Sequence, residues 1–154
     1  MVYNYSTWGL TKVEEQELDI AHRKQLRKVW NDPNKHNAQL YQQSKEKQIS
    51  SEMKAARWRA LGHMLRRDEK TPCQRAMEFY FEIPREGKKF SGRKRCTLPV
   101  RINEDIKSAS AEIPITTFDK IEDLRILKNI AQNREDWRNL SKLICGTAEG
   151  NPCL

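Results

Sequence analysis

The segment Arg57-Trp58-Arg59-Ala60-Leu61-Gly62-His63-Met64-Leu65-Arg66-Arg67 decides how the chain is interpreted. Within eleven positions it holds apolar residues at helical spacing, a Gly-His dipeptide and two flanking pairs of arginines. The pattern predicts a helix over about residues 51–67, buried on its apolar side and facing a polyanion on the other. The predicted apolar stripe consists of Met53, Ala56, Ala60, Leu61, Met64 and Leu65.

Gly62, His63 and Trp58 of this segment are each expected to have a structural role. A glycine inside a helix costs about 1 kcal/mol relative to alanine, and close approach of another backbone would be one reason to tolerate Gly62. His63 has apolar neighbours, which favour a hydrogen-bonded histidine at a helix-packing edge over a catalytic or metal-binding one. For Trp58, and for Trp137 further along the chain, a place in the core is favoured over stacking on bases.

One long helix and one short helical turn are predicted before this segment. Thr11-Lys12-Val13-Glu14 is a capping box, in which the Thr and Glu side chains satisfy free backbone N–H groups. The helix that it opens ends at Asn31-Asp32-Pro33-Asn34, because proline cannot continue the ladder. Asn37 is expected to cap the short turn, and Ser50 or Ser51 to begin the main helix.

The remaining elements are also predicted to be helical. Thr71-Pro72 begins a short aromatic helix, and Pro99 sits at the start of another. The last helical stretch covers about residues 119–144, and its apolar pattern falters near Asn133-Arg134, so it is one kinked helix or two. The chain is therefore predicted to be all-α, with about five helices in a loosely packed bundle and a basic loop, residues 85–95, between the third and fourth.

The composition of the 154-residue chain favours nucleic acid as its partner. Charged residues make up 32% and hydrophobic residues 37%, so the core is expected to be thin. The 29 Lys+Arg exceed the 21 Asp+Glu, and the formal net charge is +8. No apolar run approaches the ~20 residues that cross a bilayer, and the N-terminus lacks the features of a signal peptide. We expect an intracellular protein, nuclear or cytoplasmic, that is not secreted and has no membrane partner.

No catalytic or metal-binding motif is recognisable in the sequence. The four cysteines form no Cys-x-x-Cys pair and no histidine lies at ligand spacing from one, which favours free thiols over a zinc site. A Gly-rich phosphate loop, paired aspartates for catalytic magnesium and a nucleophile motif are all missing. We therefore expect neither an enzymatic activity nor a cofactor for this chain alone.

Basic residues are the candidates for binding phosphate. Six of the eleven residues at 85–95 are Lys or Arg and two are Gly, which is typical of a mobile loop that orders on a phosphate backbone. Such contacts give affinity with little sequence choice. The predicted contacts are Arg57, Arg59, Arg66, Arg67, Lys88, Lys89, Arg93, Lys94 and Arg95, with His22, Arg23 and Arg27 as a second set.

These residues also carry a resemblance to a protein family. Residues 57–66 resemble the R-W-x-x-L-G-H-x-L-R signature found downstream of the polymerase core in reverse transcriptases of non-LTR retrotransposons. Two positions depart from the family pattern, because Lys94 replaces the proline of G-R-P-R and Asn133 stands where Asp is usual. Five further segments resemble family segments in the same order, namely Trp8–Lys12 (the end of the thumb-entry segment), Leu18-Asp19 with His22–Arg27, Thr71-Pro72 with Ala76-Met77, Gly87–Arg93 (the basic loop) and Ala131–Arg138 (the closing motif).

The resemblance implies a division of the chain and a role for it. Residues 1–10 would be a thumb-entry segment, 11–145 a helical thumb and linker region that binds nucleic acid, and 146–154 a disordered tail. In the family, the endonuclease, the fingers, and the palm with its catalytic aspartates and magnesium precede this region. The chain would be a truncated C-terminal fragment of an RNA-directed DNA polymerase, separated from its polymerase core, that grips template RNA and primer DNA.

Two other interpretations of the residues stay open. A helix-turn-helix DNA-binding regulator would use the helices at Leu10–Trp30 and Ser51–Arg67, but the roughly 20 residues between them exceed the short turn of that motif. A helical protein-interaction module would use Phe79-Tyr80-Phe81 as an exposed apolar patch. The sequence leaves the oligomeric state undetermined.

Overall fold

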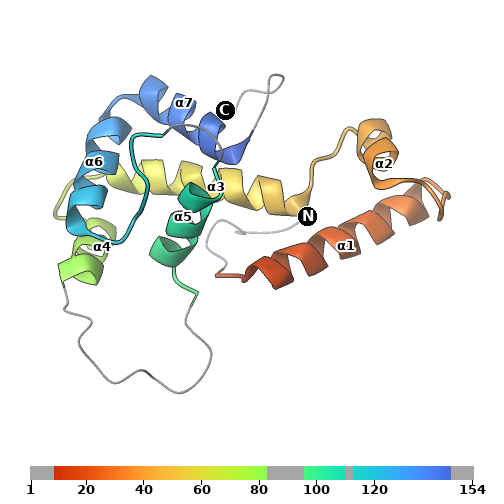
Figure 1. Cartoon of the computed structure of the whole chain (residues 1–154), viewed down its shortest axis with the longest axis horizontal. Coiled ribbons are helices and arrows are strands. Elements are labelled where there is room, and N and C mark those ends of the chain that lie inside the picture. The colour runs from red at the N-terminus through yellow and green to blue at the C-terminus, as the bar shows by residue number, and fades with distance from the viewer. Residues whose placement is uncertain (1–8, 83–95, 110–112, 147–154) are drawn as a thin grey trace, which may run out of the picture.

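The computed structural model describes residues 9–82, 96–109 and 113–146, whose regular structure is entirely helical (Figure 1). The all-α prediction is confirmed, but the described residues form seven helices instead of about five. One reason is that the predicted turn at Asn37 is a complete helix. The helices are α1 (Lys12–Val29), α2 (Asn37–Ser44), α3 (Ile49–Leu65), α4 (Pro72–Glu82), α5 (Leu98–Lys107), α6 (Ile121–Gln132) and α7 (Arg134–Cys145).

The second reason is a sharp break at Asn133, which makes the last helical stretch two helices. Asn133 has an extended backbone with φ −88° and ψ 114°, so it ends α6 and begins α7. Its Oδ1 accepts a hydrogen bond of 3.0 Å from the backbone N–H of Glu135. Asn and Asp serve equally well as N-caps, so Asn133 caps α7 as effectively as an aspartate would.

The N-terminal ends of the first three helices follow the sequence only in part. The capping box is present as predicted, because Thr11 Oγ1 accepts from the Glu14 N–H and the Thr11 N–H donates to Glu14 Oε2 at 2.7 Å. The N-cap of α2 is His36, one residue before Asn37. α3 begins at Ile49, slightly before the predicted serines.

The start of α3 is capped by a residue from another helix. Gln48, the N-cap position, makes no side-chain capping bond. Asp19 of α1 supplies it instead: Oδ1 accepts from the Ser50 N–H at 3.0 Å, and Oδ2 accepts from Ser50 Oγ at 2.6 Å. Asp19 is itself buried, so this contact fastens α1 to the beginning of α3.

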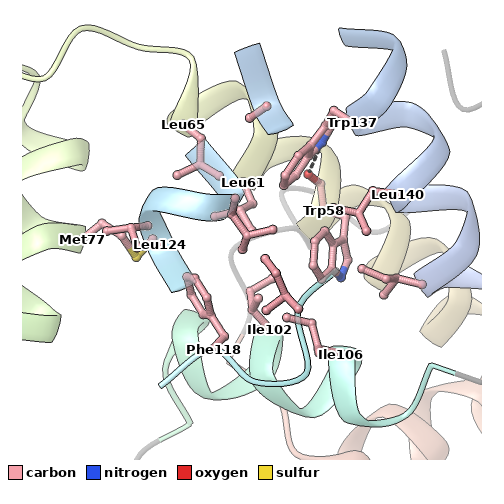
Figure 2. Close-up of a cluster of buried hydrophobic side chains, with 14 residues drawn as sticks. Trp58, Leu61, Leu65, Met77, Ile102, Ile106, Phe118, Leu124, Trp137 and Leu140 are labelled. Carbon is pink, nitrogen blue, oxygen red and sulfur yellow. Dashed lines mark hydrogen bonds between the residues drawn. The ribbon is translucent and has the colours of Figure 1, made fainter. Parts of the chain in front are cut away.

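α3 is the central helix, and its C-terminal half carries the hydrophobic core (Figure 1). Trp58 is completely buried and Trp137 is 4% exposed, so the predicted place of both in the core is confirmed. Their ring centroids lie 5.6 Å apart. Figure 2 shows the two rings with the side chains that surround them. The other buried members of this cluster are Leu61, Leu65, Met77, Ile102, Ile106, Ile115, Phe118, Leu124, Leu127, Ala131, Leu140 and Ile144.

Gly62 is packed against a side chain of another helix, and the heavy atoms nearest to its Cβ position belong to the Trp137 ring and not to a backbone. A Cβ at position 62 would lie 2.1 Å from Trp137 Nε1 and 2.5 Å from its Cε2. The aromatic ring is flat and fills the space directly over the α3 backbone, so only glycine leaves room for it. The contact brings α7 close to α3.

α1 makes polar contacts with α3 and α5 through Asp19 and Glu15. Asp19 is its one buried residue, while Val13 and Val29 are 62% and 77% exposed. In Figure 1, α1 and α7 lie on opposite sides of α3. Among the residues that the structure describes, no helix has the length and apolar character needed to span a membrane.

Candidate functional site

Part of the predicted phosphate-binding surface lies outside the residues that the structure describes. The basic loop at 85–95 lies outside the described residues, and so do its candidate contacts Lys88, Lys89, Arg93, Lys94 and Arg95. The segments 1–8 and 147–154, which include Cys153, also lie outside. The site is therefore built from the candidates on α1 and α3.

Arg57 is a buried structural residue, which corrects its assignment as a phosphate contact. It is 3% exposed, although the sequence pattern placed it off the buried stripe. Its Nε donates to Asp105 Oδ2 at 3.1 Å, and its Nη2 lies 3.4 Å from Glu15 Oε1. A phosphate would have to break both ion pairs to reach Arg57, so Arg57 is not a phosphate contact.

The ion pairs of Arg57 belong to a buried cluster that joins α1, α3 and α5. Arg101 of α5 is 3% exposed and pairs with Glu15 of α1 through Nη2 at 2.5 Å. Trp58 Nε1 donates to Asp105 Oδ2 at 3.1 Å. Burial raises the pKa of Asp105, and the charge of Arg57 opposes that rise only in part. Burial lowers the pKa of Arg101, but the hydrogen bond to Glu15 and the charges of Glu15, Glu104 and Asp105 together raise it above its ordinary value.

The second set of candidates, on α1, makes local contacts with the α2 region. Arg27 Nη2 donates to the Lys35 carbonyl at 3.1 Å and to Asn37 Oδ1 at 2.6 Å. The His22 ring lies 6.2 Å from the Tyr41 ring. Arg23 is half-buried on the same helix. These residues form a surface separate from the one that α3 builds with α7.

A groove between α3 and α7 brings four arginines together. α3 contributes Arg59 and Arg66, which the sequence analysis proposed. α7 contributes Arg134 and Arg138, which it did not. The groove has a volume of about 300 Å³. The remaining lining residues are Ala55, His63, Trp137, Ser141 and Cys145.

Helical spacing explains why these side chains share one groove. On α3, the positions 55, 59, 63 and 66 recur every three or four residues and form one stripe. On α7, the positions 134, 138, 141 and 145 do the same. The two stripes face each other because Trp137 lies against Gly62.

The positive charge in this groove is not paired with a carboxylate of the described residues. Within the described ranges, no carboxylate forms an ion pair with Arg59, Arg66, Arg134 or Arg138. Arg66 Nη1 donates only to the Ala131 carbonyl, at 3.4 Å. Burial lowers the pKa of Arg66, and the nearby charge of Arg134 lowers it further. Four cations that lack counter-charges and share a concave surface attract anions.

His63 lies at the edge of this groove. The side chain is exposed, and its Nε2 is 2.9 Å from Arg67 Nη2. Because arginine can only donate, this nitrogen accepts the bond. The predicted hydrogen-bonded histidine at a packing edge is therefore present, with a solvent-exposed ring. Arg67 is also exposed and lies beside the groove without lining it.

The arginines of α7 could have been found from the sequence. Arg134 and Arg138 are four residues apart, on either side of Trp137 along the chain, so they share a helix face beside a core residue. The spacing of Arg134 and Arg138 identifies the face of α7 on which they lie, but it does not show that this face packs beside α3. Ser141, one further turn along α7, belongs to the same stripe.

The described residues include no group of three or more His, Cys, Asp or Glu side chains that is arranged to hold a metal ion. Cys73 and Cys96 are free cysteines. Comparison of the chain with protein-family models, with curated proteins and with solved structures found no match.

Proposed function

We propose that the chain is the helical thumb and linker region of a reverse transcriptase of the non-LTR retrotransposon type. In this proposal it binds template RNA and primer DNA through their phosphates, with little sequence preference and without a catalytic centre of its own. The observation that carries the proposal is the groove between α3 and α7, where four arginines converge and no described carboxylate pairs with them.

The packing of α3 against α7 supports the family resemblance on which the proposal also rests. The two most distinctive segments of the resemblance, residues 57–66 and 131–138, are about seventy positions apart in the sequence. They meet where Trp137 covers Gly62, and they supply all four groove arginines. The groove between α3 and α7 needs both segments, and this is a physical reason for both to occur in the same chain.

The composition of the groove supports binding without sequence preference. Guanidinium groups are well suited to phosphate oxygens, and phosphate contacts carry no base information. Trp137 is the aromatic ring in the lining, and it is 4% exposed because it packs on Gly62 and Trp58. It therefore offers no face on which a base could stack.

Fluorescence anisotropy across a salt titration tests this function. The probe is a short RNA–DNA primer–template hybrid, offered in two unrelated sequences. The chain with Arg59→Gln, Arg134→Gln and Arg138→Gln combined should bind more weakly and lower the salt slope by about 2 to 3. Arg125→Gln is the matched control, since this exposed arginine of α6 lies outside the groove. No binding at low salt by a protein that circular dichroism shows to be helical would refute the proposal.

The same titration tests the basic loop independently of the groove. Changing Arg93, Lys94 and Arg95 together to Ala should lower the salt slope by up to about 3 if the loop contacts phosphates. An unchanged affinity and slope would assign the binding to the groove alone.

Both alternative interpretations fit the structure less well. In the sequence, α2 lies between α1 and α3, so α1 and α3 are not joined by the short turn of a helix-turn-helix motif. Of the aromatic residues on α4, Phe79 is 63% exposed, but the Phe81 ring packs edge-on against Phe118 of the core at 5.0 Å. A single exposed ring is not a contiguous apolar patch of the kind that marks protein-binding surfaces.

A further inference from the structure

We propose that the groove between α3 and α7 is a pocket for the phosphomonoester at the end of a nucleic-acid strand, which it binds in preference to internal phosphodiesters. The proposal rests on the phosphate-binding function proposed above and adds which phosphate the groove selects.

The size of the groove favours a chain end over a continuous backbone. At about 300 Å³, it lies at the lower limit of the range of small-molecule pockets. It is closed on two sides by α3 and α7, whose contact at Gly62 and Trp137 leaves no passage between the helices at that point. A groove of this size holds one phosphate and its adjoining sugar at a time, and the end of a strand can enter it more deeply than the backbone of a duplex that lies across its mouth.

The number of donors favours a monoester over a diester. A phosphodiester carries one negative charge and two non-bridging oxygens. A phosphomonoester carries about −1.5 to −2 charge at pH 7 and three strong acceptor oxygens. Because each guanidinium can donate two parallel hydrogen bonds, Arg59, Arg134 and Arg138 together offer more donors than the two oxygens of a diester can accept. The three oxygens and second charge of a terminal phosphate match the groove better.

Ser141 provides a further donor in the groove that lacks a partner. Its Oγ is buried and forms no hydrogen bond among the described residues, although the residue lines the groove. An unsatisfied buried hydroxyl is unfavourable, and a rotation about χ1 that turns it toward the groove would let a phosphate oxygen accept its proton. The repulsion between Arg66 and Arg134 would be relieved by the same bound anion.

The proposal is tested with short single-stranded RNAs of one sequence that carry a 5′-phosphate, a 3′-phosphate or hydroxyls at both ends. Each phosphorylated RNA is compared with the hydroxyl-ended RNA, and in each comparison both carry the fluorescent label at the end opposite to the phosphate. Affinity is measured by anisotropy at fixed salt. At least one phosphorylated RNA should bind about tenfold more tightly than the RNA with two hydroxyl ends, since a hydrogen bond to a charged group is worth about that factor. Comparison of the two phosphorylated RNAs identifies which end is bound, and inorganic phosphate should compete with it.

Two variants locate the effect. Arg138→Gln removes an exposed guanidinium, and Ser141→Ala removes the unpartnered hydroxyl. Each should reduce the preference for the phosphorylated end several-fold. Arg138→Gln should also weaken binding of the hydroxyl-ended RNA, because this arginine belongs to the phosphate-binding groove, but by a smaller factor than it weakens binding of the phosphorylated RNA. Arg125→Gln should retain the full preference. In an NMR titration with inorganic phosphate alone, the indole N–H signal of Trp137 should shift, because this residue lines the groove.

The outcomes separate this inference from the function on which it rests. Equal, salt-dependent affinity for all three RNAs would overturn the choice of a terminal phosphate and leave phosphate binding intact. A preference that survives both variants, with an unmoved Trp137 signal, would overturn the location in the groove. Failure of every RNA to bind at low salt would overturn the proposed function and this inference together.

Discussion

The indole of Trp137 occupies the place where a side chain at position 62 would begin. A Cβ on Gly62 would lie 2.1 Å from Trp137 Nε1, and that nitrogen donates to the Trp58 carbonyl of the preceding turn at 3.3 Å (Figure 2). This contact holds α7 against α3. It thereby brings Arg134 and Arg138 to the same groove as the arginines of α3.

Gly62→Ala should therefore destabilise the protein, although alanine is the better helix former by about 1 kcal/mol. The added methyl group overlaps a buried ring that cannot swing away, and overpacking of this kind costs about 1–3 kcal/mol. Urea unfolding followed by circular dichroism measures the change. In the double variant Gly62→Ala with Trp137→Leu, the penalty of the alanine should shrink. A Gly62→Ala protein as stable as the original would show that the helices separate without cost.

Arg57 and Arg59 are two positions apart, but their replacement by methionine should have different effects. The first should lower the stability of the protein, and the second should weaken its binding to nucleic acid. Arg57→Met should lower the free energy of unfolding by about 3 kcal/mol, because Glu15 and Asp105 lose a buried partner. The loss should be near the lower end of the usual range, since Arg101 and Trp58 still contact these carboxylates.

Arg59→Met should change the stability by no more than about 0.5 kcal/mol, because the side chain is exposed and makes no ion pair among the described residues. It should instead weaken binding to the RNA–DNA hybrid. Urea unfolding and anisotropy on both variants check the pair. Equal losses of stability would contradict the separate roles assigned to the two arginines.

Asp19→Ala should destabilise the N-terminal end of α3. The carboxylate caps Ser50 from 31 positions away in the sequence, and loss of a cap costs about 0.5–2 kcal/mol. Hydrogen exchange should show faster exchange of the Ser50 amide and its neighbours. Glu17→Ala is the control, since Glu17 lies on the exposed side of α1. Equal exchange rates in the two variants would mean that the cap contributes nothing.

Asp105 should make the stability depend on pH. Burial raises its pKa above the ordinary value of 3.8, so the folded protein keeps this proton at a pH where the unfolded chain has lost it. The resulting stabilisation is complete below that ordinary value and is lost as the pH rises through the folded-state pKa.

The stability of the original chain relative to Asp105→Asn should consequently fall as the pH increases across this interval. Unfolding free energies of both proteins at several pH values measure the difference, and carbon NMR of the Asp105 carboxyl group gives the pKa directly. A pKa at or below the ordinary value would show that Arg57 outweighs the burial.

Local sequence patterns were sufficient for the helices and for much of the core. The capping box at Thr11–Glu14, the break near Asn133 and the buried positions of Trp58 and Trp137 depend on residues within a few positions of one another. Helix caps and apolar periodicity are short-range properties, so they can be recognised without knowing the fold. The number of helices was underestimated because α2 has only a weak pattern and a cap without a side-chain bond.

Only the tertiary structure decided which arginines are available to a ligand. Arg57 and Arg59 stand in the same basic pattern, but Arg57 meets Asp105, 48 positions away, while Arg59 meets the arginines of α7. Periodicity identifies the face of a helix on which a residue lies, but it does not identify the helix that covers that face. The sequence by itself therefore determined a basic, all-helical chain with two buried tryptophans. The packing of α3 against α1, α5 and α7 determined which charges are neutralised inside the protein and which remain in the groove.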